Sequence, residues 1–231
     1  MFITSTIDAP RVPIHTAADG ITLHYTDFGT GTPVVLVHSW SLSSTMWEYQ
    51  VDALLTAGYR CIALDRRGHG RSEVAGTGYD LDRLTDDLAG LIEALDLRDA
   101  AIVAHSMGSC ETTHFLARYG SARVARVVFL APVTRQILDA PLAVQIACAR
   151  AFATVDLSAD LRGIDVPVLV LHGTADASAP HAITAVPTAA LLRDGRLVTY
   201  DGAPHGLYVT HKDAVNAEIL AFLAGSAAAP V

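Results

Sequence analysis

One short stretch decides the fold of this chain: Val103-Ala104-His105-Ser106-Met107-Gly108. Residues 101–104 predict the end of a buried strand, and residues 110–119 predict a helix. Ser106 then falls on the sharp turn between them, the arrangement of a nucleophile elbow. Strand and helix pass close together at such a turn, so the positions two before and two after the serine must be small. Gly108 is small, and Ala104 exceeds the usual glycine by one methyl group. The simpler alternative is an exposed serine in an ordinary loop.

A nucleophilic serine needs a histidine base, and the base needs an acid that orients it. Where the serine lies on a strand-to-helix elbow, the three residues follow one another along the chain as serine, acid and histidine. Asp176 follows a run of branched aliphatics at 166–171, and polar groups past the carboxyl ends of parallel strands are typical of ligand sites. His205 stands in a Gly/Pro-bounded loop after another predicted strand, 196–200. A helix cap for Asp176 and a solvated position for His205 are the simpler alternatives, but the order and setting of the three residues favour a catalytic triad.

Two backbone N–H groups are expected to stabilise the negative charge that develops on a substrate carbonyl oxygen. One is the amide of Met107, directly after the serine. The other is the amide of Trp40, in the loop after the predicted strand 33–37. We expect the Trp40 indole to line the acyl pocket, with plain packing as the alternative. Val133 and Leu207 complete the predicted substrate-binding residues.

Histidines and cysteines elsewhere in the chain predict no metal site. The chain has ten histidines and three cysteines, without the spacing of metal ligands. We expect His38 to be a buried histidine bonded to backbone rather than a second base. Cys61 is expected to be inert core. Cys110 starts the helix after the elbow, where the helix dipole is expected to lower the thiol pKa, but the serine has the better position for catalysis.

These motifs resemble the α/β-hydrolase fold. The resemblance rests on the elbow, the Asp65-Arg-Arg-Gly-His-Gly-Arg-Ser72 segment, the His172-Gly-Thr-Ala-Asp176 loop and the Gly202-Ala-Pro-His-Gly206 loop. More narrowly, the sequence resembles the bacterial cofactor-free haloperoxidases and their aryl-esterase relatives, from about residue 16 to residue 224. The resemblance implies nucleophile Ser106, acid Asp176, base His205 and oxyanion amides at Trp40 and Met107. It also implies ester hydrolysis, peracid formation from hydrogen peroxide in many members, and no cofactor.

The chain departs from that family in two places. The family usually has Gly and often Pro at positions that are Ser39 and Ser41 here, beside the expected oxyanion hole. Residues 131–165 are also too few for the multi-helix cap of the relatives, because they allow about two short helices. Residues 142–152 predict one of them. We therefore predict a reduced or missing cap and an open acyl site.

Composition agrees with a single α/β domain over residues 1–231, for which the resemblance implies a mostly parallel sheet covered by helices on both faces. The 51% hydrophobic content fits strands buried on both faces. The net charge of −8 argues against nucleic acid or anionic membrane partners. Arg66 and Arg67 are expected to hold their loop by charge-assisted bonds. Neither a membrane span nor a signal peptide is evident, so the cytoplasm is the expected location.

The remaining segments predict scaffold. Residues 20–28 and 33–37 are expected to pair as antiparallel strands. Leucines at helical spacing predict an amphipathic helix over 80–97, with its acidic face in water, and 214–223 predict the last helix. Residues 1–13 predict a flexible arm or a segment that bridges protomers of a homo-oligomer, and both alternatives stay open.

The function that we expect is cleavage of small-molecule carboxylic esters through an acyl-enzyme on Ser106. Perhydrolysis is a further expectation. Two alternatives remain: a lactonase, amidase or cyclising acyl-transfer enzyme on the same triad, and a non-catalytic small-molecule receptor that keeps the triad for binding.

Overall fold

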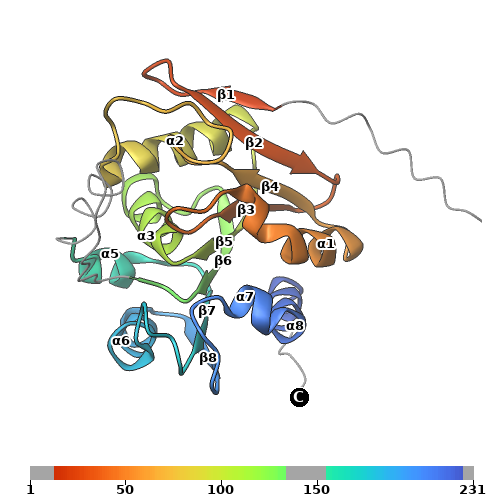
Figure 1. Ribbon diagram of the computed structural model, residues 1–231, viewed down its shortest axis with the longest axis vertical. Helices are drawn as coiled ribbons and strands as arrows, with labels where there is room; N and C mark the ends of the chain where they lie inside the picture. Colours follow the sequence, from red (N-terminus) through yellow and green to blue (C-terminus); the bar gives the residue numbers. More distant parts are fainter. Residues whose placement is uncertain (1–12, 134–154, 226–231) are drawn as a thin grey trace, which may run out of the picture.

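A computed structural model describes residues 13–133 and 155–225. Its centre is an eight-stranded sheet with the order β1-β2-β4-β3-β5-β6-β7-β8 (Figure 1). The strands are β1 (Ile14–Thr16), β2 (Thr22–Phe28), β3 (Pro33–Val37), β4 (Arg60–Leu64), β5 (Ala100–His105), β6 (Val124–Leu130), β7 (Val168–Gly173) and β8 (Gly195–Tyr200). β1 and β2 run antiparallel to their neighbours, and the other pairs are parallel.

The expected pairing of residues 20–28 with 33–37 is wrong. β2 pairs with β4, with Tyr25 opposite Leu64, and β4 in turn pairs with β3. The turn at 29–32 therefore carries the chain past the position that β4 later fills. The burial patterns fit this order, because β4, an inner strand, is buried at all but its first residue, whereas β2 is only partly buried.

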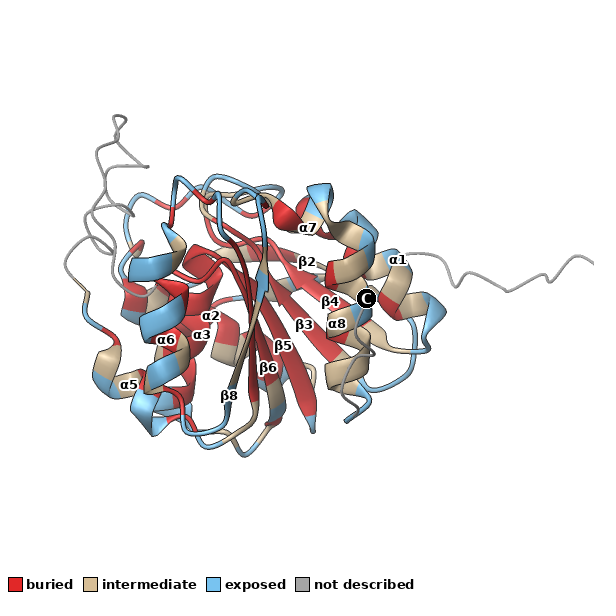
Figure 2. Ribbon diagram, turned by 90° about the horizontal axis from the view of Figure 1, so that it is seen from below, coloured by how far each residue is buried: buried red, intermediate tan, exposed pale blue. Residues whose placement is uncertain are grey.

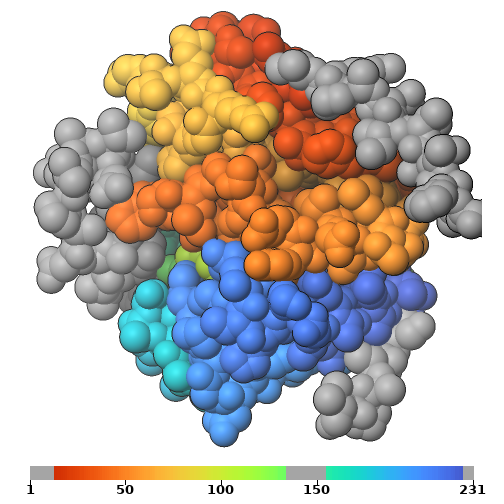
Figure 3. All heavy atoms as spheres, turned by 45° about the vertical axis from the view of Figure 1, so that its right-hand side comes forward, coloured from red at the N-terminus to blue at the C-terminus, as the bar shows by residue number. Residues whose placement is uncertain are grey.

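Helices cover both faces of the sheet, as Figure 2 shows. They are α1 (Glu48–Thr56), α2 (Leu81–Ala94), α3 (Met107–Tyr119), α5 (Ser158–Gly163), α6 (Ala185–Leu191), α7 (Leu207–Thr210) and α8 (Lys212–Leu223), with 3-10 turns η1 (Ser44–Trp47) and η2 (His181–Ile183). One core cluster joins the sheet to α2, α3, α5 and α6, and a second joins it to α1, α7 and α8. In Figure 3 the blue C-terminal helices lie against the orange segment that contains α1. The α/β architecture is thus confirmed.

Strand β5 lies in the middle of this sheet and is buried at every residue. β3 and β6 flank it, and both are parallel to it. Strands buried on both faces need continuous apolar runs rather than alternation, which explains the sequence AAIVA before His105. The carboxyl end of β5 therefore projects Ser106 from the most protected part of the sheet.

Helix α2 does not have a wholly solvated acidic face. Asp80 caps its start by accepting a hydrogen bond from the Arg83 amide, and the apolar face packs on the sheet as expected. Asp87, however, is 3% exposed and binds the buried Arg67, whose Nε and Nη2 donate to its two oxygens at 2.6 and 2.7 Å. The expectation that both arginines hold their loop by charge-assisted bonds is confirmed for Arg67 here and for Arg66 below.

Several expectations fall on residues outside the described parts. These are the arm at 1–12, the helix over 142–152, Cys148, and the chain end after 225. Within the region 131–165, α5 is one described helix, and its Leu161 packs into the core under the sheet. In the described parts of the chain, no helix is long and apolar enough to span a membrane.

Candidate active site

The turn at Ser106 has the geometry of an elbow. β5 ends at His105, α3 begins at Met107, and Ser106 between them has φ 52° and ψ −117°. A non-glycine residue with positive φ is uncommon and costs energy, and such strain gathers at functional sites. A Cβ atom on Gly108 would lie 2.5 Å from the carbonyl oxygen of Val37 in β3. This close approach of helix and strand explains why a glycine follows the serine by two residues.

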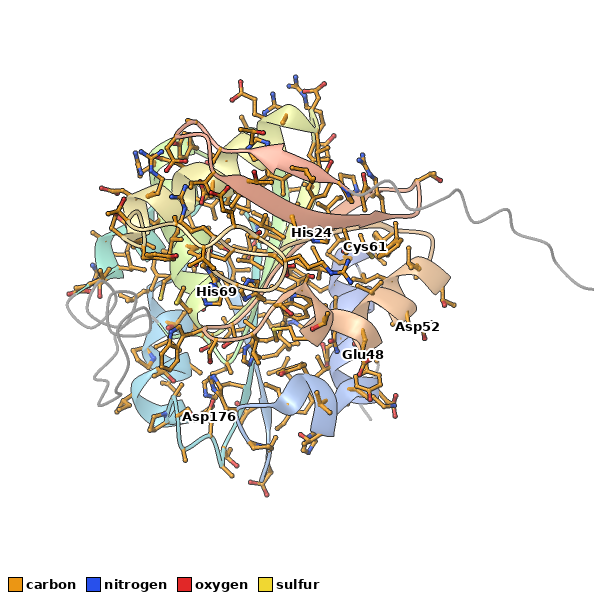
Figure 4. All side chains as sticks on the ribbon, turned by 45° about the horizontal axis from the view of Figure 1, so that its top comes forward. His24, Glu48, Asp52, Cys61, His69 and Asp176 are labelled. Carbon is orange, nitrogen blue, oxygen red and sulfur yellow. The ribbon has the colours of Figure 1, made fainter. Side chains whose placement is uncertain are left out.

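Asp176 and His205 are joined by a hydrogen bond. Asp176 Oδ2 lies 2.7 Å from His205 Nδ1, and Oδ1 accepts from the amides of Ser178 and Ala179 at 2.9 and 2.7 Å. Burial alone would raise the pKa of Asp176, but hydrogen bonds from His172, His205 and Ala179 lower this pKa below its ordinary value. The carboxylate is therefore ionised at neutral pH. Figure 4 labels Asp176, which follows the end of β7.

This bond settles what His205 is able to do. A carboxylate only accepts, so Nδ1 of the ring must carry a proton, and in the neutral ring Nε2 then holds a lone pair. The ring is about a quarter exposed. In the described part of the chain, the Ser106 hydroxyl makes no hydrogen bond to the His205 ring. The hydrogen bond between a catalytic serine and its base is often long before substrate binds.

His105 brings the two ends of the site together. Its Nε2 lies 3.0 Å from the carbonyl oxygen of His205, and the two ring centroids are 4.8 Å apart. Because His105 directly precedes Ser106, this contact places the His205 ring next to the elbow. The Tyr208 ring packs edge-on against His105, with centroids 4.9 Å apart. The structure therefore joins Asp176 and His205 by a direct hydrogen bond, and it links Ser106 to them through the neighbouring His105.

The two amides predicted for an oxyanion hole are available. Met107 is the first residue of α3, so the Met107 N–H has no partner within the helix. The Trp40 N–H donates to no other described group. The next residue, Ser41, has φ 55°, so the loop turns sharply there. The half-buried Trp40 side chain packs against two small apolar clusters, one that contains Met107 and Cys110 and one formed by Ala75 and Tyr79.

Comparison with known proteins places this geometry in a family. The model of the alpha/beta hydrolase fold matches residues 32–147, and the model of the TAP-like protein family matches residues 143–229. The chain belongs to the α/β-hydrolase fold family. The fold and the resemblance expected from the sequence are thereby confirmed.

Similar proteins of this family are named as non-heme haloperoxidases and as esterases. The non-heme chloroperoxidase of Streptomyces lividans is 35% identical, over 90% of this chain and 98% of its own. A bifunctional esterase/perhydrolase of Acinetobacter calcoaceticus is 30% identical, over 90% and 98%. The crystal structure of a bromoperoxidase from Bacillus anthracis superposes with a TM-score of 0.84 at 29% identity, over 92% of this chain and all of its own.

The α/β hydrolase has a cavity of about 750 Å³ beside the loop after β3. Its walls include Trp40 and Leu42 from that loop, His69 from the loop after β4, and Tyr208 and Val209 from α7. His69 and Glu48, another wall residue, are labelled in Figure 4. Through Trp40 and Tyr208 the cavity adjoins the site. Trp40 thus faces an open space as well as packing against its neighbours.

The other two predicted substrate-binding residues are enclosed. Val133 is 2% exposed, and its carbonyl oxygen accepts a hydrogen bond from the Cys110 thiol. Leu207 has no exposed surface and packs in the core cluster next to α1 and α8. The structure therefore gives Leu207 a packing role, and contact of either side chain with substrate stays a prediction.

The sequence did not lead us to expect that two further histidines, His105 and His172, contact the candidate triad residues. His105 binds the His205 carbonyl, and His172 Nε2 lies 2.8 Å from the Ala179 carbonyl oxygen and 3.2 Å from Asp176 Oδ2. The available signal was position. His105 adjoins the serine, and His172 ends a buried strand four residues before the acid.

The lowered thiol pKa expected for Cys110 is wrong, whereas Cys61 lies in the core as expected. Burial raises the pKa of the Cys110 thiol to about 12, and the neighbouring Glu111 acts in the same direction. The helix dipole does not outweigh this, because the thiol is buried. Burial likewise raises the pKa of Cys61 to about 12. Within residues 13–133 and 155–225, no group of His, Cys, Asp and Glu is placed to hold a metal ion.

Proposed function

We propose that this α/β hydrolase cleaves carboxylic esters by two-step acyl transfer. Ser106 attacks the ester carbonyl while His205 Nε2 takes its proton, and Asp176 holds the ring in that tautomer and stabilises its cation. The amides of Trp40 and Met107 stabilise the oxyanion. His205 then gives the proton to the departing alcohol, and a water activated by the same nitrogen releases the acid.

The observation that carries this proposal is the hydrogen bond between Asp176 and His205 beside an elbow serine. An ionised carboxylate on Nδ1 makes the opposite nitrogen a base, which the attack by serine needs. The name of the Acinetobacter relative, which includes both esterase and perhydrolase, supports the same chemistry. Hydrogen peroxide in place of water at the second step would release a peracid, and we propose this as a second activity.

The test is labelling by a fluorophosphonate, with the labelled peptide mapped by mass spectrometry and p-nitrophenyl acetate turnover followed in parallel. We expect one label per chain at Ser106 and loss of turnover on labelling. Ser106→Ala should lower kcat by at least about 10³-fold with the fold intact. Ser121→Ala, which lies just past the other end of α3, is the matched control and should keep full activity.

Near-normal turnover by the Ser106→Ala variant would remove this serine from the mechanism. Absence of both label and turnover in the parent protein would favour a receptor that uses the site for binding. A panel of lactones and amides, run beside simple esters, separates ester cleavage from the lactonase and amidase alternatives.

A further inference from the structure

A buried ion pair links the two segments that carry the oxyanion amides. Arg66, in the loop after β4, contacts Glu111 on the second turn of α3 through its Nε atom. Each side chain is 3% exposed. α3 begins with Met107, and the guanidinium of Arg66 also reaches the loop 38–40, which contains Trp40. The pair therefore connects the helix of one amide to the loop of the other.

Arg66 holds that loop by two consecutive carbonyl groups. Its Nη2 donates to the carbonyl oxygen of His38 at 2.8 Å, and its Nη1 donates to that of Ser39 at 3.3 Å. A planar guanidinium presents several donors in a fixed arrangement, so it orients both carbonyls at once.

The backbone of Arg66 fixes a third contact through His38. The Arg66 N–H donates to His38 Nε2 at 3.0 Å, so the proton of the neutral ring is on Nδ1, which lies 2.6 Å from the Ser39 carbonyl oxygen and donates to it. Burial and the charge of Arg66 lower the pKa of His38 well below its ordinary value, which keeps the ring neutral. The prediction of a buried histidine bonded to backbone is thus confirmed.

These bonds determine where the Trp40 N–H points. The peptide between Ser39 and Trp40 is trans, and in a trans peptide the C=O and N–H groups point in opposite directions. The Ser39 carbonyl is turned toward Arg66 and His38, so the Trp40 N–H is directed away from them. The Ser39 N–H meets Met46 Sδ at 3.4 Å, which holds the preceding peptide as well.

We propose that Arg66 is a positioning residue that keeps the Trp40 N–H aimed as an oxyanion donor, and that Glu111 holds Arg66 in place. The proposal rests on the proposed function of Trp40 and Ser106. If the Ser39–Trp40 peptide rotated, a carbonyl oxygen would replace the N–H and repel the developing negative charge. Loss of one oxyanion donor lowers kcat by about 10²–10³-fold.

The test replaces the whole pair, because removing Arg66 alone leaves Glu111 buried without a partner and destabilises the fold. The variant is Arg66→Met with Glu111→Leu, since apolar side chains of similar volume substitute well for buried ion pairs. The matched control is Arg67→Met with Asp87→Leu. Arg67 is also fully buried and paired, but it donates to Asp87 and Asp19 and to no carbonyl of the loop 38–40.

Turnover of p-nitrophenyl acetate, inhibition by a trifluoromethyl ketone and Tm are measured for both variants. The ketone forms an oxyanion when serine adds to it. We expect the Arg66/Glu111 variant to lose about 10²–10³-fold in kcat and a similar factor in affinity for the ketone. Its KM should stay within about threefold, because the donor acts on the transition state. The control should keep its kcat within about threefold of the parent at a similar Tm.

A folded Arg66/Glu111 variant with the kcat and ketone affinity of the control overturns the positioning role. If that variant does not fold, Arg66→Lys gives the same decision, because lysine keeps the charge beside Glu111 but cannot hold both carbonyls. A folded Arg66→Lys variant with the parent kcat also overturns it. If the Ser106→Ala variant keeps the turnover of the parent, the proposed function is overturned instead. The failure of the positioning role and the failure of the proposed function are therefore distinct.

Discussion

His172 Nε2 lies 3.2 Å from Asp176 Oδ2, the same oxygen that binds His205 Nδ1. One carboxylate thus receives two histidines on one oxygen and two amides on the other. The side chains of His172 and Asp176 have no exposed surface. A buried carboxylate with this many donors is stabilised in its ionised form, and the acid of the proposed triad is therefore also part of the structural core.

Asp176→Asn should reveal this role in the pH dependence of stability. The folded pKa of Asp176 lies below its ordinary value of 3.8, so the ionised group stabilises the fold fully above about pH 4 and loses that contribution as the pH falls further. We expect the parent to exceed the variant in free energy of unfolding by about 1–3 kcal/mol at pH 7, and the difference to shrink below pH 4. Urea unfolding from pH 3 to pH 7 measures it. A difference that stays constant over this range would contradict the prediction.

His105→Gln should reduce the fall in the free energy of unfolding that accompanies a decrease in pH. Burial, followed by the nearby His205, lowers the pKa of His105 from 6.5 to about 3. Between these values the unfolded chain binds a proton that the folded protein does not, so stability falls with decreasing pH by about 1.4 kcal/mol per pH unit. Glutamine keeps a donor for the His205 carbonyl but does not titrate. Urea unfolding between pH 4 and pH 6.5 should show the smaller slope, and an unchanged slope would refute the assignment.

Gly108→Ala should be costly because of one contact. The added methyl group would meet the backbone carbonyl of Val37 at 2.5 Å, and a backbone group in a central strand cannot move aside. We expect a loss of about 1–3 kcal/mol in the free energy of unfolding. Gly163→Ala is the control, because nothing lies within 4 Å of a Cβ atom there. Equal stabilities of the two variants in urea would count against the close approach.

The thiols of Cys61 and Cys110 should be inert in the folded protein. Burial raises the pKa of each to about 12, and thiol reagents react with the thiolate. A Cys148→Ser variant removes the third cysteine of the chain. We expect Ellman's reagent to titrate no thiol in this variant under native conditions and two in guanidinium chloride. Rapid native reaction of either thiol would show that the residue is accessible.

The order of strands and helices along the chain, and the place of the candidate site residues just after strands, were predictable because they depend on local pattern. Continuous apolar runs mark β3, β5 and β7, and the loop residues just after each run fall at the carboxyl ends of neighbouring parallel strands. That rule brings Trp40, Ser106 and Asp176 to the same edge without any knowledge of distances.

What the sequence did not reveal depends on partners distant in the chain. The place of β4 between β2 and β3 is set by pairing across more than 30 residues, which no local pattern encodes. Asp87 resembles the solvated acids of its helix, and only the approach of Arg67 makes it a core residue. For Cys110, position on the helix suggested a reactive thiol, and packing against Val133 overrides that effect.

The strands that precede the proposed nucleophile and base differ in their position in the sheet and in their burial. Ser106 follows β5, which has a strand on each side and no exposed residue, whereas His205 follows β8, an edge strand with one neighbour and partial exposure throughout. Edge segments open by local fluctuation at a lower free energy than the centre of a sheet. Mild heat or denaturant should therefore detach the base while β5 remains folded, so activity should be lost before the global unfolding transition and return rapidly when the edge strand closes again.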